Sequence, residues 1–319
     1  MSAQPESGPA PVRPTREDPG GLAAAFGAYA LWGVLPVLWK EYDFLPAIDT
    51  VAHRVIWCLL LLLAILPFRG TFGNFLAGLR DPRRMAVLTV TAAVIGLNWT
   101  VFIWAVGEGH ILEASLGYFL NPLFSVLLGF LLLGEKLTRL QWLAILMAAA
   151  AVANQIVAVG AFPWVALGVA GSFGLYGYLR KITPVGPAVG LATESLIGLP
   201  VAVGWLLLFG AREAGSDVLA GFDSGWHVFL LLMTGPATAA PLLLFATAAR
   251  RIRLATVGIL QYVAPSIMFA LAVFLYGEPL DAGKLATFAL IWAALALYTW
   301  EMLRPRGPVP IPPTGPAGG

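Results

Sequence analysis

The sequence has few of the side chains on which soluble proteins depend. Of its 319 residues only 11% are charged, and it contains one cysteine and three histidines. Soluble domains carry about 25% charged residues, so this composition excludes an ordinary soluble enzyme. It also excludes a nucleic-acid binder, which needs a strongly basic surface. The single cysteine, Cys58, cannot form an internal disulfide.

Catalytic and nucleotide-binding motifs are missing as well. The sequence contains no Walker A loop, no HExxH motif and no Cys/His cluster, and its three histidines are far apart. A phosphate-binding loop or a metal site needs such residues at a fixed spacing. We therefore expect no enzyme activity, no catalytic residue, no metal and no cofactor.

Apolar residues, in contrast, are abundant. They make up 59% of the chain, and the mean hydropathy is +0.82. About 20 apolar residues in a helix cross a bilayer, and a helix satisfies its own backbone in lipid. The sequence predicts an all-α polytopic membrane protein with ten transmembrane helices, at residues 20–39, 48–67, 86–106, 111–133, 139–158, 162–180, 188–209, 226–248, 254–276 and 283–303.

The basic residues predict the orientation of these helices. With the N-terminus in the cytoplasm, fifteen of the nineteen Lys and Arg lie on the cytoplasmic side. Three lie on the opposite side (Lys40, Arg212 and Lys284), and Arg54 lies within a span. Because cytoplasmic loops are enriched in Lys and Arg, both chain ends are expected in the cytoplasm. Residues 1–18 and 305–319, rich in Pro and Gly, are expected to be disordered tails.

An internal repeat divides the chain into residues 19–159 and 160–304. With an offset of 143 residues, Pro122 aligns with Pro265, and Gly134-Glu135 aligns with Gly277-Glu278. Offsets of 144 and 141 align Trp32-Gly33 with Tyr176-Gly177 and His53-Arg54 with Glu194-Ser195. Each copy holds five helices, an odd number, so the second copy enters the membrane from the opposite side. Inverted repeats are the architecture of alternating-access transporters.

The same stretches resemble a known family. AYALWGVLPVLWK, AHRVIWCLLLL, NWTVFIWAVGEGHILEASLGYFLNPL and LATVGILQYVAPSIMFALAVFLYGE are similar to the RarD group of the drug/metabolite transporter (DMT) superfamily, and each half resembles an EamA domain. The resemblance covers about residues 20–303. It implies ten helices, a multi-pass protein of the bacterial inner (plasma) membrane, and transport of a small molecule. Group members are often described as chloramphenicol-sensitivity or permease proteins. The resemblance also implies that the fifth and tenth helices lie outside the cavity.

Polar residues inside the apolar helices are the candidates for solute binding or gating, because burying them in lipid is unfavourable. Arg54 and Glu113 are expected at similar depth and close enough to pair, as a solute anchor, a gate or a structural ion pair. His53 and Glu194 are candidates for proton coupling, with local capping or pairing as the alternative. For the remaining candidates packing is the alternative; they are Tyr29, Trp32, Asn98, Trp99, Tyr118, Asn121, Gln261 and Tyr262.

Two prolines locate the expected cavity. Proline removes a backbone hydrogen bond, so Pro122 and Pro265 should interrupt their helices and free the carbonyls of Tyr118 and Gln261. Interruptions at matching places in two halves indicate a binding site. The alternative is that the prolines only shape packing. Gly134-Glu135 and Gly277-Glu278 are interpreted as C-terminal caps followed by an interfacial charge, and their recurrence leaves a gating role open.

The sequence therefore predicts a secondary transporter that moves a small organic solute, such as a drug or metabolite of the chloramphenicol type, by alternating access. A channel-like facilitator and a non-transporting membrane receptor or assembly factor are the alternatives. The expected partners are the solute, the lipid bilayer and the proton as candidate coupling ion, with a homodimer as a candidate assembly. No nucleic-acid partner is expected.

Overall fold

The computed structural model describes residues 17–42, 44–107, 111–159, 164–210, 224–277 and 282–304. The predicted tails therefore lie almost wholly outside the described residues, and so does the side chain of Glu113. Within these ranges the chain is helical and contains no strand.

Helices occupy all ten of the predicted ranges. They are α1 (Pro19–Trp39), α2 (Ala47–Phe68), α4 (Pro82–Gly107), α5 (Ile111–Leu133), α6 (Arg139–Val159), α7 (Trp164–Ile182), α8 (Pro187–Trp205) with the π-helix η1 (Leu206–Gly210), α9 (Gly225–Arg251), α10 (Leu254–Leu260) with α11 (Val263–Ala270) and the π-helix η3 (Leu271–Leu275), and α12 (Ala282–Leu303). A further helix, α3 (Phe72–Leu79), was not predicted, because its eight residues are too few to cross a bilayer.

Among the described residues, seven helical segments are long and apolar enough to span a membrane. They are α1, α2, α4, α8 with η1, α9, the segment from α10 to η3, and α12. In α5 and α6 the apolar described stretches, Gly117–Leu133 and Arg139–Asn154, are shorter. The chain is thus built as a polytopic membrane protein, and the count of ten spans stays a prediction.

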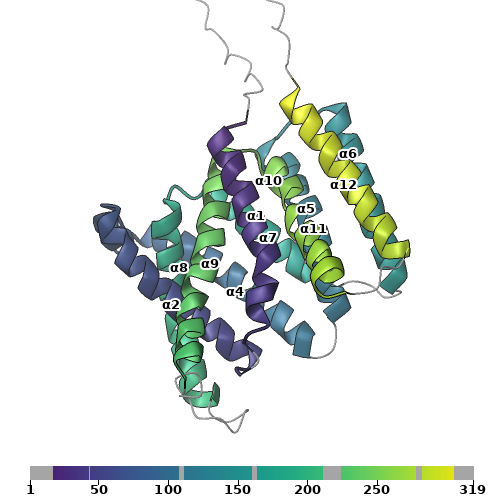
Figure 1. Cartoon of the computed structure of the whole chain (residues 1–319). Coiled ribbons are helices and arrows are strands. Elements are labelled where there is room, and N and C mark those ends of the chain that lie inside the picture. Colours follow the sequence, from purple (N-terminus) through teal and green to yellow (C-terminus); the bar gives the residue numbers. More distant parts are fainter. Residues whose placement is uncertain are drawn as a thin grey trace, which may run out of the picture.

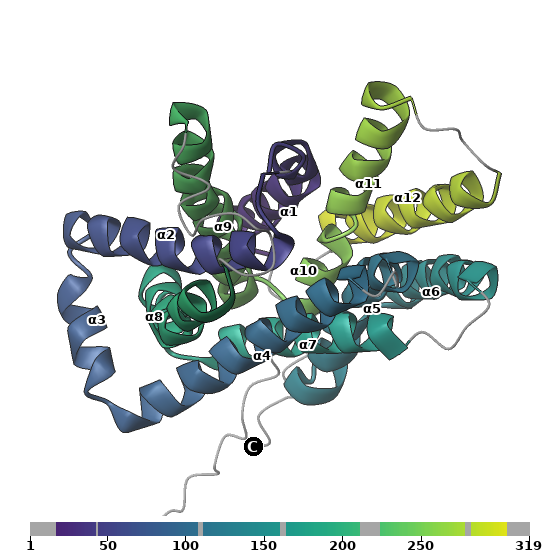
Figure 2. The same ribbon diagram turned by 90° about the horizontal axis from the view of Figure 1, so that it is seen from below.

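Helices at equivalent places in the two predicted repeats pack against each other. Contacts join α2 to α8, α5 to α10, and α6 to α12. Other contacts recur between the two repeats. The contact of α1 with α9 corresponds to that of α7 with α4, because α7 is the equivalent of α1 and α4 that of α9. The contact of α1 with α11 corresponds in the same way to that of α7 with α5. The pair of α6 and α12 lies at one edge of the bundle (Figure 2). The start of α1 and the end of α12 lie at the same end (Figure 1), which we call the basic end.

Two glycines confirm the predicted caps. Gly134, directly after α5, has φ +62°, and Gly277, shortly after η3, has φ +65°. This left-handed conformation is strained for any residue with a Cβ and ends a helix. The two positive-φ glycines are 143 residues apart, the offset of the sequence repeat.

Candidate functional site

Arg54 is held on α2 by residues of three other segments. Its Nε donates a hydrogen bond to Thr238 Oγ1 at 3.0 Å on α9. The carbon of its guanidinium lies 5.1 Å from the ring centroids of both Trp39 and Trp99. Aromatic faces attract a cation at this distance. Arg54 is nevertheless only half-buried, so its remaining N–H groups can reach a solute.

Neighbouring residues complete this Arg54 cluster. Tyr118, on α5, is 40% exposed and within electrostatic range of the guanidinium. Tyr42, between α1 and α2, donates its hydroxyl to the Leu230 carbonyl at 2.6 Å. Burial raises the pKa of Tyr42 to about 12, with Arg54 acting in the opposite direction, so this hydroxyl stays a donor near neutral pH. The predicted Arg54–Glu113 pair falls on a side chain outside the described residues.

Glu194 lies in a second cluster, deep between α4, α7 and α8. Its Oε1 accepts a hydrogen bond from Thr91 at 2.7 Å and lies 3.4 Å from Arg180 Nη1. Its Oε2 accepts from the Tyr176 hydroxyl at 3.1 Å. The side chains of Arg180 and Glu194 are 0% and 3% exposed. A buried carboxylate with three donors is well satisfied, which agrees with the local-pairing alternative.

A group of aromatic rings packs beside the Glu194 cluster. Trp32 lies 5.6 Å from Tyr29, 5.8 Å from Phe173 and 5.9 Å from Phe245, measured between ring centroids. Phe245 also stacks on Tyr176 at 6.0 Å. Tyr29 and Tyr176 are buried, and Trp32 is half-buried. Trp32 is thus joined through Phe245 to Tyr176, its equivalent position in the second repeat.

Two of the candidates connect helices to one another. Asn98 Nδ2 donates to the Val169 carbonyl at 2.7 Å and to Ser172 Oγ at 3.0 Å, which joins α4 to α7. The Tyr262 hydroxyl donates to the Phe119 carbonyl at 3.0 Å and joins the α10–α11 junction to α5. Such bonds satisfy polar groups within the protein, and they favour packing roles for both residues.

Three other candidates carry unsatisfied polar atoms. Asn121 Oδ1, Gln261 Oε1 and the Tyr29 hydroxyl are buried and have no hydrogen-bond partner among the described residues. An unpaired buried polar group is unfavourable and calls for an explanation. Since α10 packs on both α1 and α5, the three residues lie on adjoining helices.

The two prolines behave differently. Pro122 lies within α5, which is continuous. In the second half the helix is interrupted at Gln261-Tyr262, between α10 and α11, just before Pro265. The Gln261 carbonyl accepts from the Ala264 amide at 3.1 Å, so it is not free as predicted. The interruption lies about one turn before Pro265, whereas α5 runs through Pro122 without one, and a free Tyr118 carbonyl stays a prediction. His53 is buried on α2 beside Arg54.

Ion pairs tie the helices together at the basic end. Glu135, which follows the α5 cap, accepts hydrogen bonds from the Leu254 and Ala255 amides at 2.6 and 2.9 Å, at the start of α10. Lys181 Nζ lies 3.9 Å from the same carboxylate. Arg253 pairs with Glu17: burial alone would lower the pKa of Arg253, but the hydrogen bond to Glu17 raises it above the ordinary value.

Sequence reasoning did not anticipate several of these partners. Arg180 was counted only for orientation, and Glu135 was interpreted as an interfacial charge after a helix cap with a gating role left open. Thr91, Thr238 and Trp39 were not assigned to a site. The signal for Arg180 was present: α7 and α8 form a hairpin with a short turn, and Glu194 lies two turns into α8. A long arginine side chain near the end of α7 can reach that depth.

Gly190 gives a direct test of the Arg180 position. A Cβ at residue 190 would collide with Arg180 Nη1, so Gly190→Ala must displace the guanidinium from Glu194. We expect it to destabilise the purified protein by about 1–3 kcal/mol, as overpacking does. The control is Gly204→Ala on the same helix, where no atom lies within 4 Å. Thermal unfolding in detergent checks the difference, and equal stability of the two variants would contradict the geometry.

Comparison with known proteins gives consistent matches. Residues 19–154 match the model of the EamA-like transporter family. An uncharacterized transporter of Vibrio cholerae is 41% identical over 285 residues, covering 89% of this chain and 93% of the relative. Protein RarD of Salmonella typhimurium is 41% identical over 283 residues, covering 89% and 95%. A crystal structure at 20% identity has a TM-score of 0.70 and covers 88% of this chain and 97% of that chain, so the two share a fold.

Proposed function

The chain belongs to the RarD group of the EamA-like transporter family within the DMT superfamily, and from this premise we propose that it is a secondary transporter in the bacterial inner membrane. It moves a small organic solute by alternating access, through ten spans in two inverted five-helix repeats. Both termini face the cytoplasm. The observation that carries this proposal is the pairwise packing of equivalent helices, α2 on α8, α5 on α10 and α6 on α12.

Inverted repeats provide alternating access because the two halves can exchange conformations. The Arg54 and Glu194 clusters differ in accessibility, as one state of such an exchange would require. Arg54 is half-buried beside the exposed Tyr118, whereas Glu194 is sealed by Arg180, Thr91 and Tyr176. We infer that this conformation is closed at the basic end and that the solute site lies on the opposite side, next to Arg54.

The site suits a flat or amphipathic solute. Trp32 and Trp99 offer aromatic faces, and Arg54 offers charged donors for an electronegative group. Asn121 Oδ1 and Gln261 Oε1 are acceptors whose partners a solute with N–H or O–H groups would supply. Glu113 remains a proposed member of this site through its place in the sequence.

The proposed coupling ion is the proton, exchanged at Glu194 or His53 as the basic end opens and closes. Opening would separate Arg180 from Glu194 and so change the environment of the Glu194 carboxylate. Because the proton affinity of a carboxylate depends on its environment, proton binding would be linked to conformation. A channel-like facilitator would use the same site without such a cycle. Saturable counterflow in liposomes distinguishes a carrier from a channel.

The test of the proposed function is transport by Arg54 variants in liposomes, with chloramphenicol and a panel of other small organic solutes as probes. Arg54→Ala removes the cation, the Thr238 bond and both aromatic contacts, so we expect uptake to fall at least tenfold while the protein stays folded. Arg54→Lys should retain part of the activity, because charge remains without the planar donor set. The control is the exposed Arg80→Ala. Unchanged uptake by Arg54→Ala would refute the assignment.

A further inference from the structure

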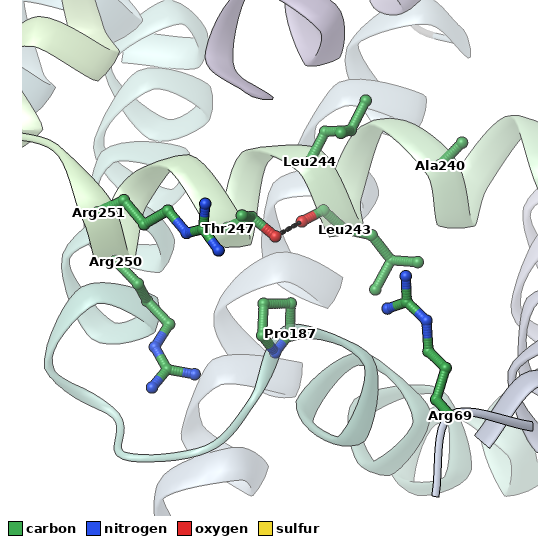
Figure 3. Close-up of a pocket in the computed structure, with 8 residues that line it drawn as sticks. All are labelled: Arg69, Pro187, Ala240, Leu243, Leu244, Thr247, Arg250 and Arg251. Carbon is green, nitrogen blue, oxygen red and sulfur yellow. Dashed lines mark hydrogen bonds between the residues drawn. The ribbon is translucent and has the colours of Figure 1, made fainter. Parts of the chain in front are cut away.

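A groove lies at the basic end, on another part of the molecule from the Arg54 cluster. It has a volume of about 790 Å³ and is formed by the end of α2, the start of α8 and the last turns of α9 (Figure 3). Its walls come from both halves of the chain, since α2 belongs to the first repeat and α8 and α9 belong to the second.

Arginines line the groove on both sides of Pro187. Arg250 and Arg251 lie on one side, and Arg69 lies on the other side, beside Leu243 (Figure 3). Arg250 donates to the Val185 carbonyl at 2.6 Å, and Arg251 lies 3.6 Å from Asp18. Each guanidinium has five N–H donors, so most donors remain for a ligand. Pro187 begins α8, whose positive dipole end adds to the attraction for an anion.

The α9 wall of the groove is apolar beyond the arginines. Ala240, Leu243 and Leu244 follow one face of α9. Thr247 lies between these residues and the arginines. Its hydroxyl donates a hydrogen bond to the Leu243 carbonyl at 2.7 Å and is therefore satisfied within the helix. From Arg251 to Ala240 the helix rises about 16 Å, which is about half the thickness of the hydrocarbon core. The α9 wall of the groove thus changes from basic to apolar toward the middle of the span, with Arg69 across the groove from Arg250 and Arg251.

We propose that this groove binds an anionic phospholipid of the leaflet at the basic end. The phosphate lies over Pro187, between Arg250 and Arg251 on one side and Arg69 on the other, and an acyl chain lies along Ala240, Leu243 and Leu244. The phosphate chemistry alone would also fit a free anion, but a free anion would leave the apolar wall uncovered. The inference rests on the membrane orientation in the proposed function, and the lipid would join α2 to the second half of the protein.

The test uses the full-length protein in a neutral detergent, titrated with dioleoyl-phosphatidylglycerol, dioleoyl-phosphatidylcholine, glycerol phosphate or inorganic phosphate while thermal unfolding is followed. We expect phosphatidylglycerol to raise the unfolding temperature at much lower concentration than the other probes. A guanidinium near an anionic lipid contributes about fivefold in affinity. The combined Arg69→Gln, Arg250→Gln and Arg251→Gln variant should therefore lose about tenfold to a hundredfold in apparent affinity.

The matched control replaces three exposed arginines outside the groove, Arg80, Arg83 and Arg139, with glutamine and should bind as the wild type does. Since Arg250 also supports the α7–α8 turn, Arg69→Gln alone provides a milder variant, with an expected loss of about fivefold. Equal effects of both lipids, equal protection by the free phosphates, or full affinity in Arg69→Gln and the combined variant would overturn the proposal. Lipid binding is measured without solute, so a failure of transport leaves this result unaffected.

Discussion

Replacing Arg180 with methionine is expected to destabilise the protein by about 3–5 kcal/mol, the effect of removing one partner from a buried ion pair. The Glu194 carboxylate would keep Thr91 and Tyr176 as donors but lose its counter-charge, at a place where its side chain is only 3% exposed. Thermal or chemical unfolding in detergent measures the effect, which should be the largest of any single substitution proposed for this chain.

The combined variant Arg180→Met with Glu194→Gln separates charge from packing. Glutamine retains an acceptor for Thr91 without a charge, so much of the stability should return, because apolar or neutral replacement of a whole buried pair is often neutral. If the Arg180–Glu194 ion pair takes part in opening the basic end, transport by the combined variant should stay low although its stability returns. A combined variant as unstable as Arg180→Met would show that the methionine fails to pack, and that charge is not the cause.

The fold was largely predictable because its main determinants are local in the sequence. Twenty apolar residues in a row specify a helix in lipid, and Gly134 and Gly277 mark helix ends by their backbone freedom. What the sequence could not place was α3, whose eight residues lie between two longer helices, and the interruption at Gln261-Tyr262. Proline restricts a helix without deciding whether it bends or breaks, and Pro122 and Pro265 differ in that respect.

The polar positions within the helices could be singled out from the sequence, but their partners could not. Arg54 and Glu194 were identified because charges within apolar helices are unfavourable without partners. Their partners Thr238 and Thr91 lie 184 and 103 residues away in the chain, and threonine is common in such helices. Asn98 was a candidate on the same grounds and instead joins α4 to α7. Only tertiary packing decides between these outcomes.

Glu135→Gln is expected to open the basic end. Glu135 is the one acceptor seen for both the Leu254 and Ala255 amides in the described part of the chain, and it also faces Lys181. A hydrogen bond to a charged acceptor contributes about 1.5–3 kcal/mol to stability. The neutral amide of a glutamine at this position would provide only part of this stabilisation. A shift of about 2 kcal/mol against the closed state corresponds to about thirtyfold in population.

The measurement is labelling by a membrane-impermeant maleimide of Tyr118→Cys in a Cys58→Ser background, with reagent added from each side. In the closed state Tyr118 should react from the side opposite the basic end. Glu135→Gln should raise labelling from the basic end and lower it from the other side, since one barrier opens as the other closes in alternating access. The control is the exposed neighbour Lys136→Gln. If labelling rose from both sides together, Glu135 would be a structural cap whose loss loosens the bundle, and the gating role would be rejected.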